Sequence, residues 1–178
     1  MRVKLAILVA ALCAAGAAAL VASAGQPPLE QARNATAGYH DIANLPTDYG
    51  LFRDKDGIAC IAMAPMPGMP AGAMGIHYVN GNYVGNPDED PSKPEAVIYE
   101  PEKNGQLRLV GLEYVVLQAA WDAHHSSRPS LFGQEFNFTD QPNRYNLPPF
   151  YSLHVWIWKH NPDGLFQMWN PDVSCANA

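Results

Sequence analysis

Three short apolar runs in the chain each carry one ionisable residue near the middle. They read GIHYVN at 75–80, GLEYVV at 111–116 and SLHVWIW at 152–158. Alternation of side chains with a period of two along these runs predicts β-strands. Because successive side chains of a strand point to opposite faces, each strand would have one purely apolar face and a second face that carries its ionisable residue.

The rest of the pattern adds one helix and more strands. Apolar residues spaced near 3.6 predict an amphipathic helix over 29–45. Further apolar runs predict strands at 57–64, 96–100 and 106–117. Asn104-Gly105 lies between the last two and is a strong hairpin signal. The chain is therefore predicted to be α+β and mostly β, with an N-terminal helix followed by an antiparallel sheet curled into a small barrel or sandwich.

Two stretches lack a regular pattern. The segment 65–75 is dense in Pro, Gly and Met and predicts a loop. The segment 118–150 is irregular but carries its own aromatic residues. At more than 30 residues it is too long for a simple linker, so it is predicted to pack over the domain as a lid or pocket wall.

The N-terminus has the form of a secretory signal. Arg2 and Lys4 precede a long Ala-rich apolar stretch, and Ala22-Ser23-Ala24 supplies the small residues of a cleavage site. We therefore predict a signal peptide over 1–24, a single domain over 25–178, and a secreted or periplasmic location. A retained membrane anchor is a weaker alternative, because the stretch is rich in Ala and ends in a cleavage-like sequence. A lipid anchor at Cys13 is weaker still, because Leu12 is bulky where a lipid-attachment site needs a small residue.

The charge balance restricts the partners. The chain has 11 basic and 17 acidic residues, and two of the basic ones lie in the predicted leader. Such an acidic protein is not expected to bind nucleic acid, or the membrane surface once the leader is cleaved. A small-molecule ligand stays open.

Two cysteines remain outside the leader, Cys60 and Cys175. In an oxidising compartment an even pair predicts one disulfide. Neither cysteine lies in a CxxC spacing, so a zinc role for them is not favoured.

The three ionisable residues are His77, Glu113 and His154. On an open surface the Val and Trp residues of their face would be exposed, and in a dry core the ionisable groups would carry a desolvation cost. A semi-enclosed pocket satisfies both conditions, with Tyr99 and Trp156 as the predicted aromatic walls. Two imidazoles and one carboxylate are a ligand set for catalytic zinc and for non-haem iron, so the three residues are predicted to bind a divalent metal (Zn, Fe or Mn).

Other roles for the same residues stay open. As an enzyme the protein would use Glu113 as its catalytic carboxylate, either at the metal or as a metal-free general base. The alternatives are a non-catalytic exported ligand-binding protein and a structural envelope protein in which each group is merely hydrogen-bonded.

Several long stretches also resemble a family of small secreted bacterial proteins labelled hypothetical. They include AMGIHYVN, PEAVIYEPEKNGQLRLVGLEYVV and YSLHVWIWKHNPDGLFQMWNPDVSC. The resemblance extends over most of the chain outside the leader. It implies an exported single-domain protein and supplies no activity.

Overall fold

The computed structural model describes residues 26–63 and 72–178. The predicted leader 1–24 and most of the predicted loop 65–75 lie outside the described residues. Within the described ranges, no helix is long and apolar enough to cross a membrane.

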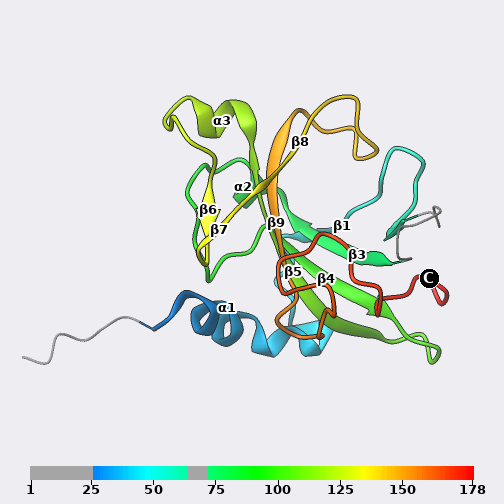
Figure 1. Cartoon of the computed structure of the whole chain (residues 1–178). Coiled ribbons are helices and arrows are strands. Elements are labelled where there is room, and N and C mark those ends of the chain that lie inside the picture. Colours follow the sequence, from blue (N-terminus) through cyan, green and yellow to red (C-terminus); the bar gives the residue numbers. More distant parts are fainter. Residues whose placement is uncertain (1–25, 64–71) are drawn as a thin grey trace, which may run out of the picture.

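A seven-stranded antiparallel sheet forms the centre of the molecule (Figure 1). Its strands are β1 (Tyr49–Leu51), β2 (Cys60–Ala62), β3 (Ala73–Asn80), β4 (Ala96–Pro101), β5 (Leu107–Leu117), β8 (Asn137–Thr139) and β9 (Phe150–Val155). The spatial order is β1-β3-β4-β5-β9-β8, and β2 pairs with β3 alongside β1. The mostly-β, α+β prediction is confirmed. Of the two predicted forms, barrel or sandwich, the barrel is wrong, because in the described part of the chain the β8 edge does not pair with β1 or β2.

Short elements complete the fold. The helices are α1 (Pro28–Thr36), α2 (Gly81–Val84) and α3 (Gln118–Asp122), with 3-10 helices η1 (Ala37–His40) and η2 (Ile42–Asn44). Strands β6 (Ser130–Leu131) and β7 (Gln134–Glu135) form a separate hairpin. The segment 118–150, predicted to be irregular, thus contains α3 and three short strands.

The predicted helix over 29–45 is divided into three pieces. Asp41 has an extended backbone, and its side chain accepts a hydrogen bond from the backbone N–H of Ala43. A short carboxylate that caps its own neighbour competes with continuous helix, and this competition does not show in the apolar spacing. The predicted hairpin is confirmed: β4 and β5 pair, and Gly105 adopts the left-handed conformation (φ +79°) that its turn requires.

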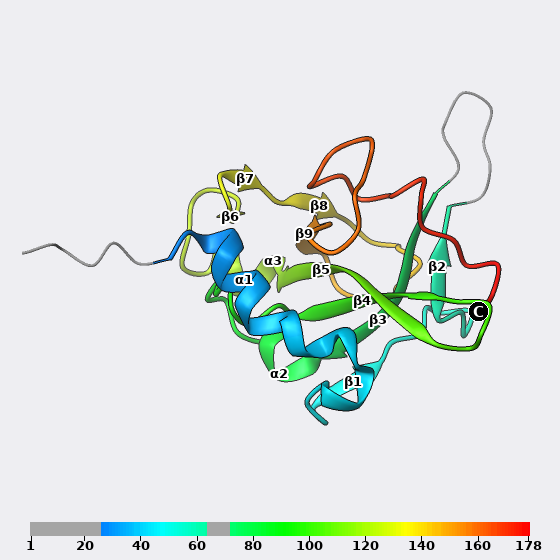
Figure 2. The same cartoon turned by 90° about the horizontal axis from the view of Figure 1, so that it is seen from below.

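The two faces of the sheet have different coverings. One face packs against α1, η1 and η2, as Figure 2 shows from below. Its buried side chains come from alternate positions of β4, β5 and β9 and include Val97, Leu112, Tyr114 and Leu153. The other face carries His77, Glu113 and His154, and at one end the C-terminal segment packs on it through Val173. These three helices, α1, η1 and η2, therefore leave the ionisable face free to form a site.

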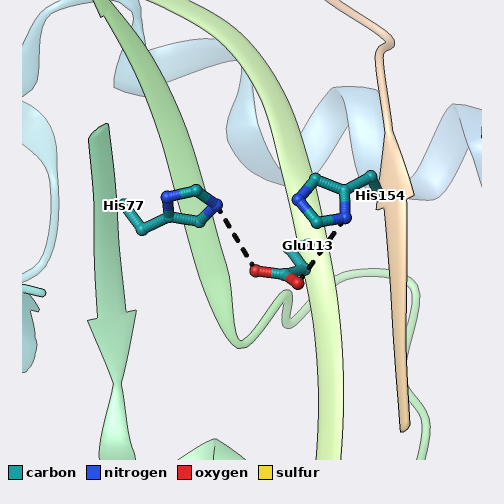
Figure 3. Close-up of side chains that lie close together, drawn as sticks. All are labelled: His77, Glu113 and His154. Carbon is teal, nitrogen blue, oxygen red and sulfur yellow. Dashed lines mark ion pairs between the residues drawn. The ribbon is translucent and has the colours of Figure 1, made fainter. Parts of the chain in front are cut away.

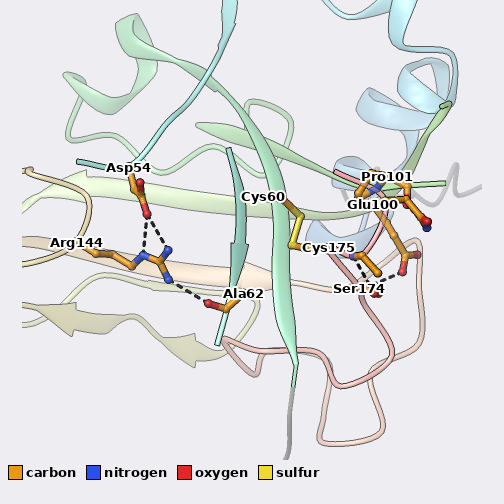
Figure 4. Close-up of a disulfide and its surroundings, with 10 residues drawn as sticks. Asp54, Cys60, Ala62, Glu100, Pro101, Arg144, Ser174 and Cys175 are labelled. Atoms are coloured by element: carbon orange, nitrogen blue, oxygen red, sulfur yellow. Dashed lines mark hydrogen bonds and ion pairs between the residues drawn. A yellow bond between two sulfur atoms is a disulfide. The ribbon is translucent and has the colours of Figure 1, made fainter. Parts of the chain in front are cut away.

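The C-terminus is fixed to β2 by the predicted disulfide. Cys60 and Cys175 form this bond across a sequence separation of 115 residues (Figure 4). Glu100 adds two contacts, since it accepts a hydrogen bond from the backbone N–H of Ser174 and pairs with Lys159 at 2.7 Å. The C-terminal residues Ser174 and Cys175 are thereby held against strands β4 and β2, which lie far from them in sequence.

Candidate metal centre

The pairing of four strands brings the three ionisable residues together. Glu113 on β5 is directly opposite His154 on β9 and, on its other side, Ala96 on β4. His77 lies on β3, opposite Ile98, so it is displaced by two residues from that row. It reaches Glu113 across β4, and the small side chain of Ala96 leaves that path free.

The side chains converge with Glu113 in the middle (Figure 3). Its two carboxylate oxygens lie 3.5 Å from Nε2 of His77 and 3.6 Å from Nδ1 of His154. Each residue offers one ligand atom, and all three atoms lie within 4.8 Å of one another. The predicted grouping of these residues is present, and it allows a metal site.

The polar atoms of this cluster are poorly satisfied. Both ring nitrogens of His154 and Nδ1 of His77 are buried, and none of them has a hydrogen-bond partner among the described residues. The two carboxylate–imidazole distances exceed the 2.7–3.2 Å of an ordinary hydrogen bond. Mutual hydrogen bonding therefore does not account for the burial of these groups, which carries a free-energy cost unless something else binds them.

Burial also determines the charge of the cluster. Desolvation lowers the pKa of His77 to about 4, although the nearby Glu113 opposes the shift, and lowers the pKa of His154 to about 3. Both imidazoles are therefore neutral at pH 7 and free to donate a lone pair. Desolvation raises the pKa of Glu113, with His77 and the Ser152 hydroxyl acting in the opposite direction. Burial therefore favours the neutral form of all three groups.

The separations suit a first-row metal after small side-chain movements. Ligand atoms about 2.0–2.1 Å from a tetrahedral metal lie about 3.3 Å from one another. The two carboxylate–imidazole distances, 3.5 and 3.6 Å, are close to that spacing but end on different oxygens of Glu113. Because the three ligand atoms lie within 4.8 Å of one another, the side chains must move closer together to bind one ion. Three protein ligands of this type also leave coordination positions open for water or a ligand.

A cavity of about 230 Å³ opens beside the cluster. His77 and Glu113 form part of its wall, and nine of the other lining residues are apolar: Phe52, Ile61, Met74, Val79, Val84, Ala96, Val115, Leu147 and Phe150. Gly81 and Tyr145 are the remaining described residues of the lining. Open positions on a bound metal would therefore face a small space with apolar walls.

Arg144 fixes two parts of the cavity wall to each other. Its guanidinium donates to Asp54 at 2.7 Å and to the backbone carbonyl of Ala62 at 3.1 Å (Figure 4). The backbone N–H of Lys55 donates to the Arg144 carbonyl. Because Tyr145 follows in sequence, this clamp holds the end of the 118–150 segment against the wall formed by β2.

The two predicted aromatic walls lie elsewhere. Tyr99 is buried on the opposite face of β4, in the main core, where its hydroxyl donates to the Tyr39 carbonyl. The prediction for Tyr99 is wrong because its neighbour Ile98 shares the face of His77. Strand alternation therefore points the Tyr99 side chain to the other face of the sheet. Trp156 stacks on the His154 ring, with centroids 6.0 Å apart, but belongs to the second apolar cluster instead of the cavity wall.

Glycines at 75 and 111 do not open space for a ligand. The Trp156 ring fills the position beside Gly111, where an added Cβ would meet it at 3.1 Å. Gly75 has a φ of +100°, and an added Cβ would lie 2.6 Å from the Tyr99 carbonyl oxygen. Both glycines permit close packing within the sheet.

Sequence reasoning placed Val79 and Val115 on the site face, and both line the cavity. It missed Met74 and Tyr145, which lie where a loop and an irregular segment were predicted. Phe150 was also missed, although it has the same strand parity as His154 and could have been found by extending the alternation two residues beyond Ser152.

Comparisons with protein-family models, curated proteins and solved structures find no match to this chain. The resemblance to small secreted bacterial proteins stays a prediction. Function must therefore be argued from the site itself.

Proposed function

We propose that His77, Glu113 and His154 hold a divalent metal ion that binds, or acts on, a small organic molecule. The observation that carries this proposal is the convergence of the largely enclosed Glu113 carboxyl with two buried imidazoles, three of whose four ring nitrogens make no hydrogen bond to the described residues. A divalent cation would stabilise the ionised form of Glu113 and would bind the imidazole lone pairs.

The ligand set narrows the metal to zinc, iron(II) or manganese(II). Two imidazoles and one carboxylate suit a borderline metal, whereas calcium and magnesium prefer oxygen ligands. At such a centre, metal-bound water or metal-bound ligand would be the reactive species, and Glu113 would be the carboxylate closest to it. The apolar walls of the neighbouring cavity would limit the access of bulk water to the metal.

Metal-free chemistry at the same site is the second candidate. The Glu113 carboxylate lines the cavity and lies next to His77, so it is placed to accept a proton from a ligand there. This reading predicts the same dependence on Glu113 but no dependence on metal. A non-catalytic exported binding protein is the third candidate, with the same pocket holding its ligand without turnover. The disulfide supports an oxidising compartment for all three candidates.

Elemental analysis tests the proposal. Protein prepared without a histidine tag should contain close to one equivalent of zinc, iron or manganese per chain. The variants His77→Ala and His154→Ala should each lose most of it, whereas His124→Ala should keep it, because His124 is exposed in the connection after α3. Metal retained by both site variants would overturn the metal centre.

Glu113→Gln separates a ligand from a merely buried residue. A metal-binding carboxylate should lose most of the metal affinity on this change while the protein keeps its fold. Cobalt substitution then tests for an open coordination position. The absorption spectrum of the cobalt protein should change when azide is added, and an unchanged spectrum would indicate a closed structural site instead.

A further inference from the structure

The cavity beside the candidate metal centre restricts what can bind there, and the inference drawn from it rests on the proposed function. Nine of the 13 described residues that line the cavity are apolar, and the only carboxylate or imidazole groups among these 13 are two of the proposed ligands, His77 and Glu113. The Tyr145 hydroxyl faces the sulfur of Met74 at 3.6 Å, a weak contact that leaves it free for a better acceptor. A ligand that fills the cavity must therefore present polar atoms at one end only.

Polar ligands with many hydroxyl groups do not fit these walls. Each hydroxyl buried against valine, leucine or phenylalanine without a partner would cost about 1–3 kcal/mol. Sugars and polyols are excluded on this ground, because Phe52, Val84 and Leu147 offer them no hydrogen bond.

The charge of the site selects the polar end. A divalent metal with one carboxylate ligand and two neutral imidazoles has a net charge of +1. Among the described residues no lysine or arginine lines the cavity, and the neighbouring Arg144 is already paired with Asp54. One negative charge on the ligand would neutralise the centre, whereas a second would lie unpaired against apolar walls.

The volume sets the size. An apolar protein cavity of about 150 Å³ accommodates benzene. A cavity of about 230 Å³ has space for one ring, or a short branched chain, together with a head group.

We propose that the ligand of the metal centre is a small apolar monocarboxylate, whose carboxylate coordinates the metal while its hydrocarbon part fills the cavity between Val79, Leu147 and Phe150. The Tyr145 hydroxyl lines the same cavity and would donate to the carboxylate oxygen that does not bind the metal.

Titration calorimetry with benzoate on the metal-loaded protein tests this inference. Benzoate should bind at least tenfold more tightly to the metal-loaded protein than to the metal-free protein. It should also bind at least tenfold more tightly than benzyl alcohol, which lacks the charge, and phthalate, which has a second one. Equal affinity with and without metal would overturn coordination by the head group, and phthalate binding as tightly as benzoate would overturn the apolar wall.

A matched pair of variants locates the binding. Leu147→Asp places a carboxylate in the cavity wall and should weaken benzoate binding at least tenfold while the metal content stays at one equivalent. Leu51→Asp makes the same change on an exposed residue of β1 that lies outside the cavity lining, and it should have no effect. Unchanged binding in Leu147→Asp would overturn the cavity as the ligand site.

The outcomes distinguish the two proposals. Metal uptake without benzoate binding overturns the monocarboxylate inference and leaves the metal centre intact. A chain that takes up no metal overturns the proposed function and this inference with it.

Discussion

Removal of the Cys60–Cys175 disulfide should strongly destabilise the protein. The bond closes a loop of 115 residues. In the chain-entropy model such a loop restricts the unfolded chain by about 4.8 kcal/mol at 25 °C, and a native disulfide typically contributes about 2–5 kcal/mol. Since a domain of this size has about 5–15 kcal/mol of total stability, the loss is a large fraction of the whole.

Urea unfolding of the double variant Cys60→Ala/Cys175→Ala measures this loss. We expect the free energy of unfolding to fall by about 3–5 kcal/mol and the melting temperature to fall by about 10–20 °C. The wild-type protein in excess reductant is the control, because it loses the crosslink and keeps both sulfur atoms. If both samples stay within about 1 kcal/mol of the oxidised wild type, the crosslink does not act on the unfolded chain as argued.

Three further predictions concern single positions. Gly75→Ala should lower the free energy of unfolding in urea by about 1–3 kcal/mol, because an added Cβ would lie 2.6 Å from a backbone oxygen at a φ of +100°. Gly50→Ala is the control and should leave the free energy of unfolding almost unchanged, because an added Cβ there has nothing within 4 Å. Ala96→Val should lower metal affinity at least tenfold in a competition titration, because Ala96 lies between the strands that carry two of the ligands; unchanged affinity would contradict the path described across β4. The Arg144 guanidinium lowers the pKa of Asp54, so the Asp54–Arg144 pair should stabilise the fold above about pH 4 and lose this contribution as the pH falls further. Asp54→Asn should remove this acid dependence in denaturation measured from pH 7 to pH 2.

The sequence predicts which residues share the site face, but it does not predict the strand order and register that bring them together. Strand alternation alone put His77, Glu113 and His154 on the face opposite the apolar one, because the period of two leaves no freedom within a strand. Their mutual distance depends on register and strand order. The direct pairing of Glu113 with His154, and the reach of His77 across β4, come from long-range contacts that no local pattern encodes.

The failures have the same origin. Tyr99 was assigned to the pocket without fixing the face of its own strand, although its neighbour Ile98 proved to share the face of His77. The three-residue strand β1 was not predicted because it is held by pairing with β3 and has no apolar alternation of its own. Tyr145 comes from a segment whose position depends on the Arg144 clamp, an interaction 90 residues apart in sequence.

The reach of His77 over β4 has a kinetic consequence. The three donors belong to strands that are first, third and fourth in a row of four hydrogen-bonded neighbours, so no hairpin or isolated pair of strands contains the complete set. An ion that needs all three donors can be captured only after β3, β4, β5 and β9 have assembled. It would therefore lower the rate of unfolding and leave the rate of folding almost unchanged. At a thousandfold excess over its dissociation constant it would add about 4 kcal/mol to the folded state.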